Sequence, residues 1–82
     1  MLTQETFVIY IKGKTYSTNK NYEGYYTDII RYDGKKLAVT TLHHINAIKF
    51  KSTQACLTAV RQLLTECSDI DSITIEKLEN SL

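Results

Sequence analysis

The 82-residue sequence predicts one α+β domain with the element order β-β-β-α-β, in which one mainly antiparallel sheet carries one helix on one face. Three observations predict this fold. Runs of β-branched and aromatic residues fill the first half of the chain, an Asp-Gly pair joins two of these runs, and the apolar residues after position 52 recur at helical spacing. The length fits one domain rather than two, so residues 1–82 form a single domain.

The first strand is expected at residues 7–11, a continuous apolar run that Lys12-Gly13 closes. Successive side chains of a strand point to opposite faces, and both faces of this run are apolar. The pattern therefore favours a central strand. The polar residues 15–24 that follow are compatible with a loop or with a ragged edge strand.

A β-hairpin is expected next. Residues 25–32 resume β character, and Asp33-Gly34 favours a two-residue type I′ turn, because both of its central residues need positive φ. The partner strand is expected at residues 36–42, with Leu37 and Val39 on one of its faces.

A connection at residues 43–51, with a short turn at residues 45–48, leads to a helix that Ser52 or Thr53 caps. One stripe of this helix holds its apolar side chains: Ala55, Cys56, Ala59, Val60, Leu63, Leu64 and Cys67. The two cysteines lie too far apart along one helix for a disulfide, so we interpret both as core residues in a reducing compartment.

The last strand is expected around Ile73 and Ile75, which alternate with polar residues. It can lie parallel beside the first strand through a right-handed crossover. In this arrangement nothing in the chain covers the sheet face opposite the helix, where Val8, Tyr10 and other tyrosines would lie.

Charge and hydropathy limit the functional classes. The net charge of +1 argues against a dominant nucleic-acid or membrane function, although residues 1–51 carry +4 and residues 52–82 carry −3. No apolar run approaches the ~20 residues of a membrane span, and the N-terminus has no secretory pattern. We therefore expect a cytoplasmic protein.

We find no catalytic or metal-binding constellation and expect neither an enzyme nor a cofactor. The adjacent His43 and His44 would point to opposite faces of a strand, which suits a shared metal poorly. The flanks of Cys56 do not indicate a reactive thiol. The carboxylate pairs Asp69 with Asp71 and Asp28 with Asp33 look like turn and helix-end residues, and the three glycines are scattered.

Six tyrosines interleaved with lysines are the unusual feature of the sequence. Tyrosines on an open sheet face can bind a protein partner, can stack on single-stranded bases, or can simply pack across strands. The candidate binding residues are Tyr10, Lys12, Tyr16, Tyr25, Tyr26, Tyr32, Lys35 and Lys36.

Residues 47–55 (AIKFKSTQA), followed by Val60 and Leu63, resemble a sheet-to-helix segment of small proteins from phages and mobile elements of low-GC Gram-positive bacteria. The strand at residues 7–11 resembles the N-terminal strand of the same proteins. The resemblance implies no catalytic residue. It implies a protein that binds and blocks a host or defence protein, as anti-CRISPR proteins do.

The sequence thus predicts a non-enzymatic protein-binding module, phage-encoded, that inhibits or modulates a host or defence protein. One alternative is a single-stranded nucleic-acid-binding protein that uses tyrosines and lysines on an open sheet face. Another is a small homodimeric structural protein.

Overall fold

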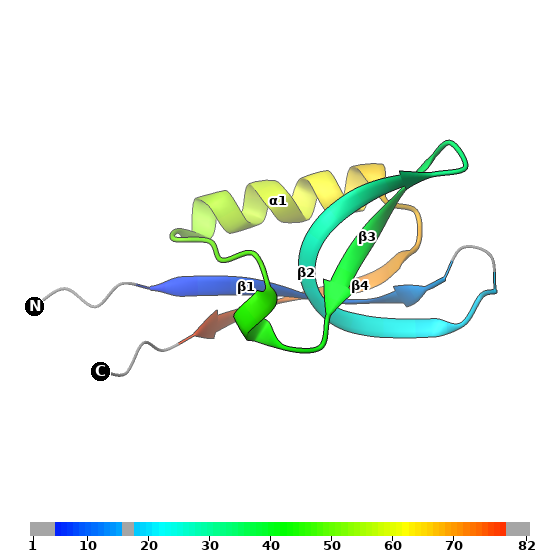
Figure 1. The fold of residues 1–82 in the computed structure, drawn as a ribbon. Helices are drawn as coiled ribbons and strands as arrows, with labels where there is room; N and C mark the ends of the chain where they lie inside the picture. Colours follow the sequence, from blue (N-terminus) through cyan, green and yellow to red (C-terminus); the bar gives the residue numbers. More distant parts are fainter. Residues whose placement is uncertain (1–4, 16–17, 79–82) are drawn as a thin grey trace, which may run out of the picture.

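The computed structural model describes residues 5–15 and 18–78, and it confirms the α+β fold: one antiparallel sheet of four strands in the order β3-β2-β1-β4 and one α-helix (Figure 1). The elements in chain order are β1 (Thr6–Lys14), β2 (Asn21–Tyr32), β3 (Lys35–Thr41), the 3-10 helix η1 (His44–Asn46), α1 (Thr53–Glu66) and β4 (Ile70–Leu78).

Strand β1 is central, as predicted, with β2 on one side and β4 on the other. Its inner face, which faces α1, contributes Phe7, Ile9 and Ile11 to the core, and α1 contributes Cys56 and Leu63. All five side chains are buried, four of them completely, so the core is one layer between one sheet and one helix.

The hairpin of β2 and β3 has the predicted turn, because Asp33 and Gly34 both have positive φ values, 53° and 75°. Strand β2 begins earlier than predicted: Asn21–Gly24 pair with β1, so the loop interpretation of these residues is wrong. The pairing with β3 shifts at Thr27, where β2 bulges. Beyond the bulge β2 curves away from β1, and the hairpin rises beside α1 (Figure 1).

Ser52 caps α1, since its hydroxyl accepts a hydrogen bond of 3.1 Å from the backbone N–H of Ala55. The cysteines behave as predicted: Cys56 and Cys67 are free and buried.

Ahead of the helix, Phe50 pairs with Phe7 through two backbone hydrogen bonds of 2.8 Å. The connection thereby carries the chain back to the beginning of β1 before α1 starts.

The predicted parallel pairing of the last strand is wrong, because β4 runs antiparallel to β1. The cause lies in the connection just described. Since α1 starts near the beginning of β1, it runs in the same direction as β1 and ends near Gly13, which pairs with Ile70. Strand β4 must therefore return in the opposite direction.

The outer face of the sheet, opposite α1, is covered in part, which corrects the expectation that nothing covers it. Val8 lies on this face and is completely buried. The connection between β3 and α1 passes over this side, where the His44 ring meets the Tyr25 ring at a centroid distance of 6.1 Å. The face stays accessible farther along β1, at Lys12.

The two oppositely charged halves of the sequence interleave in space. Lys36 pairs with Glu66 at 2.8 Å, and Lys77 pairs with Glu5 at 2.9 Å. Each ion pair joins one half of the chain to the other, so the molecule has no simple positive and negative ends. Among residues 5–15 and 18–78, no helix is long and apolar enough to cross a membrane.

Candidate interaction surface

The structure separates the candidate tyrosines and lysines between the two faces of the sheet. Tyr10, Lys12 and Tyr25 lie on the outer face, where Tyr10 pairs with Tyr25 across β1 and β2. Tyr32 and Lys35 are opposite each other on the outer face of the β2–β3 hairpin. Tyr16 lies outside the described residues.

Tyr26 and Lys36 lie on the inner face instead. The Tyr26 ring stacks on Phe50 with a centroid distance of 6.5 Å and an interplanar angle of 9°, and it packs against the core. Lys36 holds Glu66 of α1 and thereby fixes the hairpin to the helix. These contacts give Tyr26 and Lys36 a structural role.

Two cross-strand tyrosine–carboxylate pairs organise the outer face. The Tyr10 hydroxyl donates to Glu23 on β2, and the Tyr25 hydroxyl donates to Glu76 on β4 at 3.2 Å. The two rings meet edge to face at a centroid distance of 5.0 Å. The pairs join β1, β2 and β4 into one rigid patch.

The surroundings of both phenols raise their pKa above the ordinary value of 10. The hydrogen bond to Glu23, with partial desolvation, raises the pKa of Tyr10 to about 12. Desolvation and the hydrogen bond to Glu76 also raise the pKa of Tyr25. At neutral pH these hydroxyls are therefore hydrogen-bond donors and not bases.

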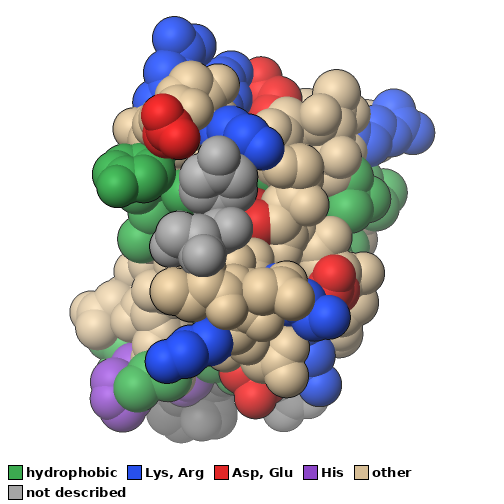
Figure 2. Space-filling view, turned by 90° about the vertical axis from the view of Figure 1, so that its right-hand side faces the viewer, with side chains coloured by type: hydrophobic (Ala, Val, Ile, Leu, Met, Phe, Trp, Pro, Cys, Tyr) green, Lys and Arg blue, Asp and Glu red, His purple; other side chains and the backbone are tan. Residues whose placement is uncertain are grey.

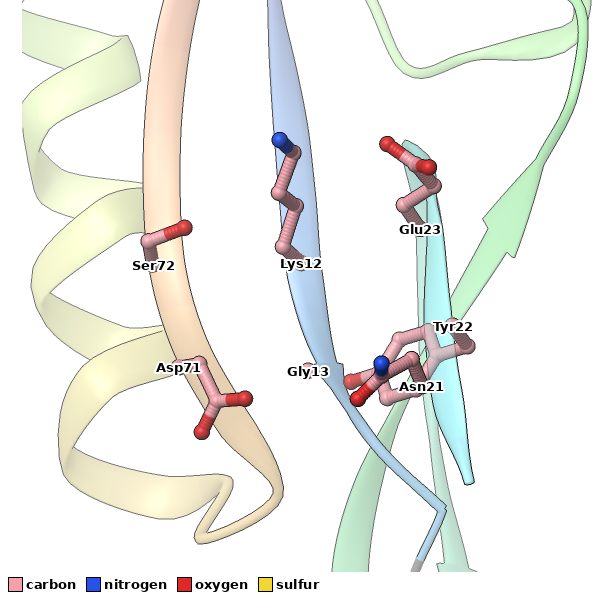
Figure 3. Close-up of a pocket in the computed structure, with 7 residues that line it drawn as sticks. All are labelled: Lys12, Gly13, Asn21, Tyr22, Glu23, Asp71 and Ser72. Atoms are coloured by element: carbon pink, nitrogen blue, oxygen red, sulfur yellow. The ribbon is translucent and has the colours of Figure 1, made fainter.

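A polar hollow of about 410 Å³ lies on the outer face beside this patch, and Figure 3 shows its side chains. Lys12 stands in its centre, between Glu23 on β2 and Ser72 on β4, its partners in the sheet register. Asp71 and Asn21 lie lower in the same view. The mixed charges suit hydrogen bonding to polar groups, and no histidine or cysteine lines the hollow.

Tyr22 is a structural residue of this region that the sequence analysis did not single out. Its hydroxyl donates to Asp69 at 2.9 Å, and its ring passes so close to Gly13 that a Cβ at that position would lie 2.8 Å from it. The same Cβ would lie 2.1 Å from the Asp69 carbonyl oxygen. The glycine in an otherwise regular strand was the available signal, because it marks a close approach.

The β2–β3 hairpin carries a second, more apolar hollow of about 260 Å³. Ile30, Tyr32 and Leu37 line it, and Ile30 and Tyr32 are 48% and 61% exposed. We call these three side chains the hairpin patch. Lys35 is exposed beside it, and Arg31 is exposed on the other face of the hairpin, opposite Lys36. Basic side chains gather at the top of the molecule, where the hairpin ends (Figure 2).

The sequence analysis missed Ile30 and Leu37. The register that the Asp33-Gly34 turn sets would have revealed them, because it places Ile30 opposite Leu37 on the face of Tyr32.

The groups considered for catalysis are separated in space or engaged in structural contacts. Burial raises the pKa of the Cys56 and Cys67 thiols, so neither is activated. Asp69 accepts the Tyr22 hydrogen bond, and Asp33 forms the hairpin turn. In the part of the chain that the structure describes, no three His, Cys, Asp or Glu side chains are placed to hold a metal ion.

Comparisons with known proteins identify no relative. No family model matches the chain, and no curated protein and no solved structure shows significant similarity to it.

Proposed function

We propose that this protein is a non-enzymatic protein-binding module that contacts its partner through the hairpin patch. The exposure of Ile30 and Tyr32 carries the proposal, because both project from a paired strand and lie on one face with Leu37, the cross-strand neighbour of Ile30. Exposed aromatic and aliphatic side chains around a hollow are typical anchors of protein interfaces.

The charges around the hairpin patch indicate the partner's chemistry. Lys35 is exposed opposite Tyr32 on the face of the patch, whereas Arg31 lies opposite Lys36 on the other face of the hairpin, where Lys36 binds Glu66. A complementary surface would insert an apolar side chain into the hollow and would carry Asp or Glu around it.

A pull-down from nuclease-treated host lysate with matched variants tests this proposal. The variant I30S/Y32S removes the exposed anchors, whereas L42S changes an apolar residue outside the hairpin that is more exposed (81%) than either anchor. We expect one stoichiometric protein to bind the wild type and L42S but not I30S/Y32S. Recovery of the same proteins with I30S/Y32S as with the wild type would contradict the use of the hairpin patch.

We further propose that the partner is a host or defence protein and that the module inhibits it in the host cytoplasm. This step rests only on the resemblance of residues 47–55 to small phage and mobile-element proteins. Phage plating on cells with an active CRISPR system tests one class of target. Inhibition predicts more plaques with the wild type than with I30S/Y32S, and equal plaque numbers would count against an anti-CRISPR role.

Single-stranded nucleic acid is the alternative partner, and the Tyr10 and Tyr25 rings beside Lys12 favour it. The carboxylates of Glu23 and Glu76 oppose it, because they place negative charge at the hydroxyls of the rings that would stack on bases. Fluorescence anisotropy with labelled oligonucleotides distinguishes the two. Tight binding that weakens steeply with salt would favour nucleic acid over a protein partner.

A further inference from the structure

Strand β4 is an open edge of the sheet. Among the described residues it pairs with β1 alone, so one side of its backbone faces outward. Natural sheets protect such edges with proline, lysine, bulges or short strands. At the opposite edge, β3 has two lysines at its start and a bridge from Lys36 to Cys67. In contrast, β4 is nine residues long, and its lysine (Lys77) and its register shift (at Asp71) lie near its two ends, so residues 72–76 between them contain no proline, lysine or bulge.

An exposed apolar strip runs along this edge. Glu66 marks the flank of α1 that faces β3, because it binds Lys36. At 100° per residue, Leu57 and Leu64 lie about 160–180° around the helix from Glu66, and so they are on its opposite flank. This opposite flank faces β4. Leu57, Leu64 and Ile75 on β4 are 46%, 57% and 38% exposed.

We propose that β4 pairs antiparallel with β4 of a second copy of this chain, with Thr74 opposite Thr74 at the two-fold axis. This interface is separate from the hairpin patch and does not depend on the proposed function. It joins two four-stranded sheets into one of eight strands with both helices on the same face. The outward-facing backbone groups of each strand then find partners in the other.

The sequence of β4 is complementary to itself in this register. Ile73 comes opposite Ile75 of the other copy on the inner face, and Ser72 comes opposite Glu76 on the outer face.

The neighbouring symmetric registers are worse. Centring the pair on Ile73 places Ile75 opposite Asp71, where the pairing of β4 with β1 shifts register, so the regular ladder ends at Ile75. Centring it on Ile75 places Ile73 opposite Lys77 and sets a charge against an isoleucine on the inner face, where the apolar strip must pack. The side chains of β4 therefore favour pairing with a second copy of β4, and they favour the register centred on Thr74 over its two neighbours.

The position of α1 also suits this dimer. The helix packs over β1 and β4, and strands in a sheet lie about 4.8 Å apart. A two-fold axis beside β4 then places the axes of the two α1 helices about 10 Å apart. This separation is at the upper end of the range of interaxial distances between packed helices. Leu57 and Leu64 of the two copies would fill the space between them.

Cysteine cross-linking at the two-fold axis tests the register. In T74C the two new cysteines face each other with a Cα separation of about 4.5–5.5 Å, within disulfide range. In the matched variant S72C they lie four residues out of register, about 13 Å apart. Both positions are exposed on the outer face, and the native cysteines are buried. Under mild oxidation with diamide we expect a covalent dimer of T74C and none of S72C.

Sedimentation of the wild type and of I75K tests association itself. We expect a dimer of the wild type at micromolar concentration and a dissociation constant raised about tenfold or more by the charge in I75K. Far-ultraviolet circular dichroism verifies that I75K is folded. A monomeric wild type, equal dimerisation of folded I75K, or cross-linking of S72C as readily as T74C would overturn the proposal.

Discussion

At the scale of single residues, hydrogen bonding decides what the tyrosines can do. An exposed phenol is free to bind a partner through its hydroxyl, but those of Tyr10 and Tyr25 are engaged with Glu23 and Glu76. Their rings therefore contribute area and shape, whereas Tyr32, 61% exposed beside Ile30, offers the more accessible ring. The hairpin thus carries more of the proposed interface than the centre of the outer face does.

The Tyr10–Glu23 pair gives a titration that can be measured. We expect Tyr10 to ionise near pH 12, and E23Q to return its pKa toward the ordinary value of 10. Because the pKa is raised in the fold, the stabilisation from this pair is present below pH 10 and is lost as the pH rises toward 12. Tyrosinate absorbance of the wild type, E23Q and Y10F measures the shift. An unchanged titration curve in E23Q would show that Glu23 does not hold the phenol.

At the scale of elements, the helix shows how much of the buried face a periodic sequence pattern can predict. The stripe predicted from the sequence included Leu63 and Leu64 together, yet Leu63 is completely buried and Leu64 is 57% exposed. Helical spacing places both residues within 100° of each other, but only the neighbouring strands decide where the buried arc ends. The sequence pattern alone therefore could not separate a core residue from one on the exposed strip.

This distinction predicts two different costs for the same substitution at adjacent positions. We expect L63A to lower the free energy of unfolding by about 2–5 kcal/mol, because it leaves a cavity in the core. We expect L64A to cost less than about 1 kcal/mol in dilute, monomeric protein, because its side chain is already hydrated. Urea unfolding of both variants at low concentration measures the difference, and equal costs would contradict the assigned helix orientation.

Local signals predicted most of the elements, and long-range geometry caused the errors. The hairpin turn, the helix cap and the central position of β1 each follow from a few adjacent residues. The direction of β4 does not, because it depends on where the connection before α1 takes the chain, and the Phe7–Phe50 pairing that decides this joins distant residues. The same limit applies to the candidate site, since only the strand register shows that Tyr25 lies on the outer face and Tyr26 on the inner face.

At the scale of the whole molecule, the two proposed surfaces lie on different parts of the sheet. The hairpin patch belongs to β2 and β3, whereas the self-association edge is β4, and β1 separates them. A dimer formed through β4 would therefore leave both hairpin patches accessible. This arrangement allows one assembly to present two copies of the partner-binding surface.

Because the chain is small, dimerisation should change its measured thermal stability. A domain of 82 residues buries a modest share of its surface, so an added interface should contribute measurably to its stability. If folding and β4 pairing are coupled, each tenfold increase in concentration stabilises the dimer by about 1.4 kcal/mol, or about 0.7 kcal/mol per chain. For a domain of this size that corresponds to a rise in Tm of about 3–6 °C.

Calorimetry over a range of protein concentrations measures this dependence, with I75K as the matched control. We expect the Tm of the wild type to rise with concentration and the Tm of I75K to rise less or stay constant, because lysine at the edge weakens the pairing and the residue that it replaces is itself 38% exposed. The variant I30S/Y32S should keep the concentration dependence of the wild type, since the hairpin patch lies outside the β4 edge. A wild-type Tm that does not depend on concentration would show that dimerisation does not stabilise the fold.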